Sequence, residues 1–331
     1  MYFYVSIVYN NHKYLPEWGG NMHENDYMAL CEMAAEPQMN ARTIAYVHQH
    51  ISAFLKKKER VLICFENSPN SFGAVLEEAV LRCDAVPVFP EDLRWKTLLR
   101  TSFFNHCAAV VGTPLLVLGL AKLAKRMETP LYFRNVLLAG YPTVGWMIDG
   151  IRQGLDCRLF GCFDPCVGPV IAGFSCPETP AIHVRSDEYA VEIVDEQGNA
   201  VPENERGEIV LYPVSDPQLR FHTGDFGRLD RSHCSCGCKS PRIMDFDTVR
   251  HVDQELSQLG AKLHMWTSIL DCRLSRTEFG LELEIVTFPG EKLPKLPSCA
   301  KLVVRNWNPE TDIPFPHMFN LKNRHFSEDN G

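Results

Sequence analysis

Short apolar runs alternate with helix-like segments through the first half of the chain, and this alternation limits the fold more than any other feature. Runs such as "RVLICF" and "NVLLAG" are continuously apolar, as in strands that are buried on both faces of a sheet. Segments such as "TIAYVHQHISAFLKK" and "LLVLGLAKLAKRM" carry apolar residues at helical spacing. The alternation predicts a mostly parallel sheet wrapped by helices, which we extend to about residue 183.

The pattern changes after this region. "YAVEIVDEQGNAVPENERGEIVLYPV" reads as strands joined by polar turns, which predicts an antiparallel sheet that continues through "LRFHTGDFGRLD". Near residue 250, the helix-like "HVDQELSQLGAKLHM" precedes the strand-like "GLELEIVTF" and "AKLVVRNW". We therefore predict an α/β fold with two domains. Residues 1–247 hold the parallel core and the antiparallel sheet, and residues 248–331 form a small α+β domain.

The composition argues against several kinds of partner. Of the 331 residues, 45% are hydrophobic and 22% are charged, as in an ordinary globular protein. A net charge of −8 argues against a nucleic-acid partner, and the run "KKKER" is expected at a solvated helix end. No apolar stretch of about 20 residues occurs, so we expect no membrane span. The odd count of 13 cysteines argues against a secreted disulfide framework, which favours a cytoplasmic protein with reduced thiols.

The segment "FHTGDFGRLD" contains a Thr-Gly-Asp turn that could hold a sugar. The carboxylate of Asp225 can accept two hydrogen bonds from a vicinal diol, and such charge-assisted bonds are strong. Gly224 would let the backbone come close to a ligand. A Thr-Gly-Asp turn is common on protein surfaces, so the flanking residues decide its meaning.

These flanks resemble the adenylate-forming enzyme superfamily, which includes acyl-CoA synthetases, adenylation domains and luciferases. That family shows a "G-N-x-V-P-x-x-x-x-G-E" stretch followed by an "[RH]-T-[GR]-D" turn. The matching residues here are Gly207, Glu208, Thr223, Gly224 and Asp225. The resemblance implies that Asp225, with Thr223 beside it, binds the ribose hydroxyls of ATP or AMP. It covers about residues 45–245 in motif order and residues 250–326 in outline.

The thiol-rich string that follows, "C-x-C-G-x-x-x-P-R-I", is similar to the phenylacetate-CoA ligase branch of this superfamily. Members of that branch can pair it with an upstream cysteine and histidine, present here in "GFSCPETPAIH". The implied ligands are Cys176, His183, Cys234 and Cys236. Three thiolates and one imidazole are the ligand types of a closed, structural zinc site. Two alternatives stay open: the thiols are buried and free, or Cys238 or His233 replaces one of the four.

Two upstream stretches resemble the family's other nucleotide-binding motifs. "NVLLAGYP" is similar to the strand and turn that contact adenine and the acyl group, which assigns Gly140 and Tyr141 to this role. "CRLFGCFDP" resembles "Y-G-x-[ST]-E", so Phe160 would stack on adenine beside Gly161. Asp164 would help to hold Mg²⁺ where the family has a longer Glu. The alternative is that "LFGCF" is only the end of a buried strand.

Two parts of the family pattern are missing or altered. No Ser/Thr/Gly-rich phosphate loop ending in Lys is found, and the motif order would place it before residue 40. In the family, a small C-terminal domain swings over the active site with a catalytic Lys. The matching segment "IPFPHMFNLKNRHF" offers Lys322, which would stabilise charge on the α-phosphate.

The resemblance therefore implies an enzyme, an AMP-forming acid–thiol ligase. It would use ATP and Mg²⁺ to activate an aromatic or small carboxylic acid as an acyl-adenylate, and then transfer the acyl group to a thiol such as coenzyme A. The missing phosphate loop favours the alternative, a catalytically degenerate ligand-binding protein on the same fold. A homodimer is expected from the base rate of protein assembly.

Overall fold

The computed structural model of the chain describes residues 29, 32–69, 71–139, 145–163, 170–176, 178–247 and 254–310. Four of the residues proposed from the sequence, Gly140, Tyr141, Asp164 and Lys322, lie outside these ranges. Most of the region before residue 40, where the motif order would place a phosphate loop, lies outside them too. The roles of these residues stay predictions.

Eleven strands form one continuous sheet in the order β2-β1-β3-β4-β5-β6-β7-β11-β10-β9-β8. The first five strands are β1 (Arg60–Ile63), β2 (Val86–Val88), β3 (Ala109–Gly112), β4 (Asn135–Leu138) and β5 (Arg158–Phe163). They pair in parallel, as the alternation of apolar runs predicts. The helices around them are α3 (Pro37–Ile51), α4 (Phe72–Arg82), α5 (Trp95–Phe104), α6 (Pro114–Arg126) and α7 (Gly145–Gly154).

The sheet continues into an antiparallel half. Its strands are β6 (Gly173–Ser175), β7 (Ala181–Val184), β8 (Tyr189–Val194), β9 (Arg206–Pro213), β10 (Phe221–Asp230) and β11 (Arg242–Asp247). β6 pairs antiparallel with both β5 and β7, so this half begins earlier than the expected change near residue 183. β6 has 3 residues and β7 has 4 residues, and strands this short show no periodic pattern in a sequence.

Helices cover both faces of the parallel half. Successive residues of a strand point to opposite faces, so the strands pack against both helix layers. Val61 and Ile63 of β1 pack with α3 and α4, whereas Leu62 packs with α5, α6 and α7. Every residue of α6 from Pro114 to Ala124 is buried. This helix is enclosed on all sides, which explains why its sequence is apolar all round.

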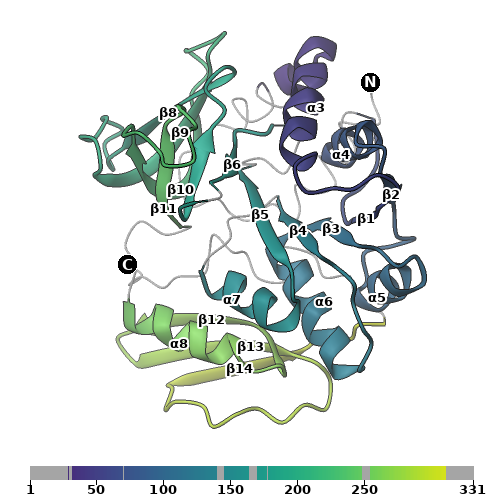
Figure 1. Cartoon of the computed structure of the whole chain (residues 1–331). Coiled ribbons are helices and arrows are strands. Elements are labelled where there is room, and N and C mark those ends of the chain that lie inside the picture. The colour runs from purple at the N-terminus through teal and green to yellow at the C-terminus, as the bar shows by residue number, and fades with distance from the viewer. Residues whose placement is uncertain are drawn as a thin grey trace.

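The C-terminal part forms a second, smaller sheet. Its elements are α8 (Gln254–His264), β12 (Ile269–Thr277), β13 (Gly280–Thr287) and β14 (Lys301–Asn306). The strand order is β12-β13-β14, with an antiparallel first pair and a parallel second pair. α8 packs on one side of this sheet, and the other side joins the hydrophobic cluster of α5, α6 and α7. The layer of α5, α6 and α7 thus lies between two sheets (Figure 1).

The chain is therefore α/β, with a large mixed sheet whose first half is parallel and a separate three-stranded sheet. The predicted fold class is confirmed. The division into two domains at residue 247 stays a prediction. Residues of both sheets belong to one hydrophobic cluster, so the two parts are packed against each other.

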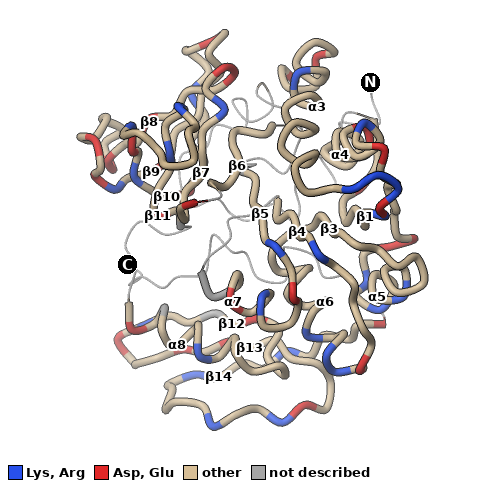
Figure 2. Tube along the Cα trace, viewed as in Figure 1, with Lys and Arg blue, Asp and Glu red and all other residues tan. Residues whose placement is uncertain are grey.

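The lysines of the basic run are solvated, but the run does not lie at a helix end as expected, since α3 ends at Ile51. Lys56, Lys57 and Lys58 are exposed in the segment between α3 and β1, a blue stretch in Figure 2. Lys57 Nζ pairs with Asp84 at 2.8 Å, and both side chains are exposed. Within the described residues, no helix has the length and apolar character needed to cross a membrane.

Candidate metal centre and nucleotide site

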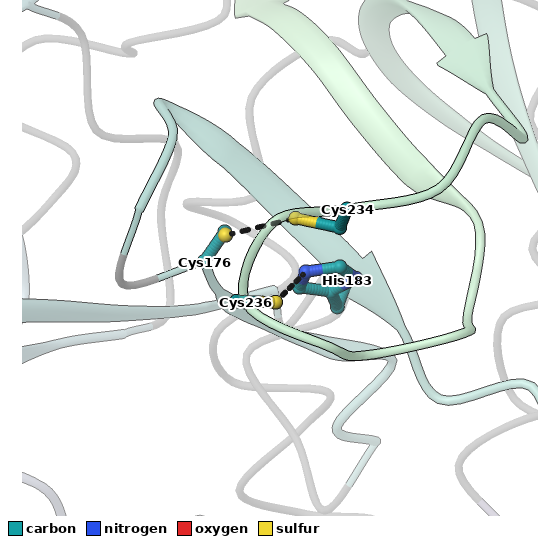
Figure 3. Close-up of side chains that lie close together, drawn as sticks. All are labelled: Cys176, His183, Cys234 and Cys236. Carbon is teal, nitrogen blue, oxygen red and sulfur yellow. Dashed lines mark hydrogen bonds between the residues drawn. The ribbon is translucent and has the colours of Figure 1, made fainter.

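Three cysteines and one histidine converge where β6, β7 and the loop between β10 and β11 meet. The ligand atoms of Cys176, His183, Cys234 and Cys236 all lie within 4.8 Å of one another. The Sγ atoms of Cys176 and Cys234 are 3.6 Å apart, and His183 Nε2 lies 3.1 Å from Cys236 Sγ. The four side chains point toward one centre (Figure 3). The structure therefore brings together the four residues proposed as metal ligands.

Strand pairing explains this convergence. β7, which carries His183, pairs with β6 on one side and with β11 on the other. Cys176 directly follows β6, whereas Cys234 and Cys236 lie in the loop that leads into β11. Pairing of these three strands therefore places Cys176 and the Cys234–Cys236 loop beside the imidazole of His183.

Cys234 and Cys236 reach the same centre through a turn. The backbone N–H of Gly237 donates to the carbonyl oxygen of Cys234 at 3.0 Å, and Gly237 has a φ of +82°. In an extended strand, the Cα atoms of residues i and i+2 are about 6.6 Å apart. Cys234 and Cys236 lie outside the strands, and the turn between them brings their ligand atoms within 4.8 Å.

The second nitrogen of His183 orients its ring. Nδ1 lies 3.2 Å from the carbonyl oxygen of Ser240. A carbonyl oxygen only accepts, so Nδ1 carries the proton and Nε2 presents its lone pair to the cysteines. No sequence motif marked Ser240, because its contribution is a backbone carbonyl that any residue could supply.

The thiols differ in acidity when no metal is bound. The backbone N–H of Cys236 is the main cause that lowers the pKa of Cys234 to about 7. The backbone N–H of Cys238 lowers the pKa of Cys236, but burial and the neighbouring sulfurs raise it to about 11. Cys234 is thus the more acidic of these two thiols. A bound cation would favour the thiolate form of both.

The ligand set fits a tetrahedral ion such as Zn²⁺. A Zn–S distance of about 2.3 Å places tetrahedral ligands about 3.8 Å apart. The Cys176–Cys234 separation of 3.6 Å agrees with this, and three of the four ligands are buried. Cys238 and His233, the alternative ligands, are not part of the group that converges. Four protein ligands leave no position open for water, which suits a structural role.

Thr223, Gly224 and Asp225 lie inside β10, which corrects the interpretation of this stretch as a turn. The register of β10 against β9 shifts here, as at a bulge, and Gly224 has a φ of +65°. Thr223 Oγ1 donates to the carbonyl oxygen of Ile209 at 2.8 Å and accepts the N–H of Asp225 at 3.1 Å. A bulge re-aims side chains without reversing the chain, so the strand continues through the motif.

The two halves of the family motif contact each other across β9 and β10. Glu208 Oε1 accepts the backbone N–H of Gly224 at 3.2 Å. His222 Nδ1 lies 3.3 Å from the other carboxylate oxygen of Glu208. Asp225 is only 1% exposed. The spacing of "GE" and "TGD" in the sequence therefore corresponds to a direct hydrogen bond that holds the bulge.

Phe160 and Gly161 lie in the middle of β5 and pair with Leu137 and Leu138 of β4. The Phe160 ring stacks on Phe54, with centroids 4.2 Å apart and an angle of 12° between the rings. One face of Phe160 is thus covered by a protein side chain, and adenine would have to use the other. The N–H of Gly161 donates to Ser175 Oγ at 2.8 Å.

A group of residues on α3, which no sequence motif marked, braces β6 beside the metal centre. The His50 ring stacks on Phe174 at 4.3 Å, and Tyr46 contacts the same ring at 5.5 Å. The buried guanidinium of Arg185 lies 4.7 Å from the centre of the Tyr46 ring and donates to Thr43 Oγ1. Burial lowers the pKa of His50, which favours its neutral form. The sequence signal that could have found this group is the helical spacing of Thr43, Tyr46 and His50.

Solved structures match this fold, whereas no family model and no curated protein matches the sequence. 2-Hydroxyisobutyryl-CoA ligase in complex with 2-HIB-AMP matches with a TM-score of 0.57 and 17% identity, over 74% of this chain and 58% of that chain. A benzoate CoA ligase from Burkholderia xenovorans LB400 matches with a TM-score of 0.56 and 12% identity, over 85% and 65%. The amide bond synthetase McbA from Marinactinospora thermotolerans matches with a TM-score of 0.52 and 15% identity, over 80% and 62%.

These likenesses define the class of fold, which this chain shares with two CoA ligases and an amide bond synthetase. At identities of 12% to 17% they concern the fold alone. The chain spans about three fifths of the length of these structures.

Proposed function

We propose that Cys176, His183, Cys234 and Cys236 hold a structural Zn²⁺. The convergence of their ligand atoms within 4.8 Å is the observation that carries this proposal. The ion joins the β6–β7 hairpin to the loop that leaves β10, the strand that carries Asp225. Its role is to hold these two segments together, since four protein ligands occupy the whole coordination sphere.

We propose further that the chain acts as an AMP-forming acid–thiol ligase of the phenylacetate-CoA ligase kind. It activates a small or aromatic carboxylic acid as an acyl-adenylate and transfers the acyl group to a thiol such as coenzyme A. The support is the fold shared with CoA ligases, one of them solved with a bound acyl-AMP, together with the buried Asp225 at a bulge of β10.

In this proposal each residue has one task. The Asp225 carboxylate accepts hydrogen bonds from the ribose hydroxyls, and Glu208 and Thr223 hold the bulge that aims it. Phe160 stacks on adenine with the face opposite Phe54.

The remaining tasks fall to residues outside the described ranges. Gly140 and Tyr141 line the adenine and acyl sites, Asp164 helps to hold Mg²⁺, and Lys322 stabilises charge on the α-phosphate. These assignments come from the motif resemblance alone.

A second candidate function is favoured by a specific observation. The sequence contains no phosphate loop, which is the part that grips the β- and γ-phosphates in this superfamily. A chain without that grip could still bind AMP or an acyl-adenylate through Asp225 and Phe160. It would then be a ligand-binding protein on the adenylate-forming fold.

One experiment separates the two functions. ATP–pyrophosphate exchange is measured with benzoate, anthranilate, phenylacetate and 2-hydroxyisobutyrate, alongside calorimetric titration with AMP. Exchange with any acid that is lost in Asp225→Ala supports the ligase. AMP binding without exchange supports the binding protein, and the absence of both contradicts both. Light scattering of the same sample tests the expected homodimer.

A further inference from the structure

Helix α6 is covered by two sheets at once. It packs against the parallel sheet through residues such as Val110 and Val136, and against the C-terminal sheet through residues such as Val286 and Phe288. These side chains and Leu118 of α6 belong to one hydrophobic cluster. A helix that is apolar all round needs cover on every side, and the C-terminal unit (residues 254–310) supplies one of those sides.

Lys122 is the one charged residue between Pro114 and Ala124, and it reaches into the C-terminal unit. Its Nζ donates to the carbonyl oxygens of His264 at 2.9 Å and Trp266 at 3.3 Å, and also to that of Ile269. The His264 carbonyl lies at the end of α8, where a helix leaves acceptors unpaired, and the other two lie in the turn that follows and at the first residue of β12. Lys122 is 6% exposed, and a buried ammonium group is tolerated only with such partners.

A second contact between the helices and the C-terminal unit is made by aromatic side chains. The Trp95 ring contacts Phe288 and Trp307 of the C-terminal unit, each with centroids 6.2 Å apart. Gly119 makes room for it, because a Cβ at this position would lie 2.0 Å from Trp95 Cζ2. Trp95 Nε1 also donates to the carbonyl oxygen of Leu116 at 2.9 Å. Side chains of α5, α6 and the C-terminal unit are thus closely packed against one another.

Polar contacts surround this apolar centre. Arg126 pairs with Glu291, and its guanidinium lies 5.3 Å from the centre of the Phe288 ring. At the other end, Arg94 Nη1 donates to the carbonyl oxygen of Glu310 at 3.1 Å. An apolar centre with a polar rim is the anatomy of a specific, well-packed interface.

We propose that the C-terminal unit is a permanent part of the core and keeps one orientation against α5, α6 and α7 while the protein works. Moving it away would expose the apolar side of α6 to water and strip Lys122 of the three carbonyls it contacts. This differs from the swinging C-terminal domain that the family resemblance implies. The proposal depends on packing, and the proposed role of Lys322, which follows this unit in the chain, then has to be met without a movement of the unit.

Hydrogen exchange of the full-length, zinc-loaded protein tests this proposal, with and without ATP and Mg²⁺. We expect the amides of α6 and of β12 and β13 to open together and to keep their protection when nucleotide is added. Lys122→Met should speed exchange in both regions by at least about tenfold, because it breaks their shared interface. Lys125→Met, on the exposed end of the same helix, is the control and should change neither.

Two results would overturn the proposal. One is exchange of β12 and β13 that is about tenfold faster than that of α6 in the unsubstituted protein, which means that the unit opens on its own. The other is loss of protection in α6 on addition of ATP and Mg²⁺, which means that the unit moves. If Lys122→Met does not fold, Phe288→Leu weakens the same interface more mildly and is read in the same way.

Discussion

The Sγ atoms of Cys176 and Cys234 lie 3.6 Å apart, although 58 positions separate the two residues in the sequence. Backbone pairing of β6, β7 and β11 creates this proximity, and His183 and Cys236 complete the group. The arrangement leads to a direct test of metal binding.

Removing two of the ligands is expected to release the metal. The double variant Cys234→Ser/Cys236→Ser should hold less than about half an equivalent of zinc, because two ligands are too few for a structural site. Metal analysis of the purified protein measures this. Cys83→Ser, which changes a half-buried thiol outside the group, is the matched control and should keep its zinc. Unchanged zinc in the double variant would contradict the assignment.

The stability of the metal-free protein should pass through a maximum with pH. The pKa of Cys234 is lowered from 9.0 to about 7, so the unfolded chain binds more protons between these values and the unfolding free energy rises with pH there. The pKa values of Cys107, Cys157 and Cys236 are raised from 9.0 to about 11, so the unfolding free energy falls again over that interval. Urea unfolding with chelator and reductant measures both slopes.

The comparison of wild type with Cys234→Ser isolates the first slope. The difference in unfolding free energy between the two proteins should grow as the pH rises from about 7 to about 9, in the direction that favours the wild type. A difference that shrinks over this range contradicts the lowered pKa of Cys234.

Adding one methyl group to α6 should strain the contact with α5. Gly119→Ala places a Cβ 2.0 Å from the Trp95 ring, and overpacking of this kind costs about 1–3 kcal/mol in unfolding free energy. Denaturant unfolding measures the loss. Gly161→Ala is the control, since its nearest neighbour would be at 3.8 Å, and it should stay within about 0.5 kcal/mol of wild type. Equal effects of the two substitutions would show that Gly119 is not a packing requirement.

The buried carboxylate of Glu188 pairs with the buried Arg185 of its own segment and with the exposed Arg42 of α3, and we expect the two arginines to differ in their effect on stability. Arg185→Met leaves the buried carboxylate of Glu188 with less compensation and is expected to cost about 3 kcal/mol. Arg42→Met removes the 56% exposed partner of the same carboxylate and should cost less than about 1 kcal/mol. The unfolding free energies of both variants test this order, and the reverse order would contradict it.

The nucleotide proposal depends on Asp225. Asp225→Asn keeps the shape of the side chain but loses its charge, so AMP affinity should fall by at least about tenfold. Calorimetric titration measures the affinity, and circular dichroism checks the fold. Asp187→Asn, whose side chain is 71% exposed, should bind AMP as wild type does. An unchanged affinity in Asp225→Asn would remove this residue from the site.

Local pattern was sufficient for most of the parallel half. Continuous apolar runs predicted β1, β3, β4 and β5, because strands buried on both faces need apolar side chains throughout. β6 and β7 were less visible, since strands of 3 and 4 residues carry no periodicity. The motif at Thr223–Asp225 was visible too, but its letters suit a turn and a bulge equally, and pairing with β9 decides between them.

The ligand residues and their arrangement have different origins. Cysteine and histidine side chains are legible in a sequence, so the four members of the group could be proposed from residue types and the family resemblance. Their convergence depends on the register of three strands and on the turn at Gly237, and neither is written in local composition.

By itself, the sequence determined that strands and helices alternate and that "LLVLGLAKLAKRM", which contains Lys122, forms an apolar-rich helix. Only the tertiary structure decided what covers the second side of α6 and where Lys122 finds its acceptors. The first of these acceptors, the His264 carbonyl, lies 142 positions away in the chain. Apolar character is a property of each residue, whereas the surface that buries it comes from a distant segment, and only folding brings the two together.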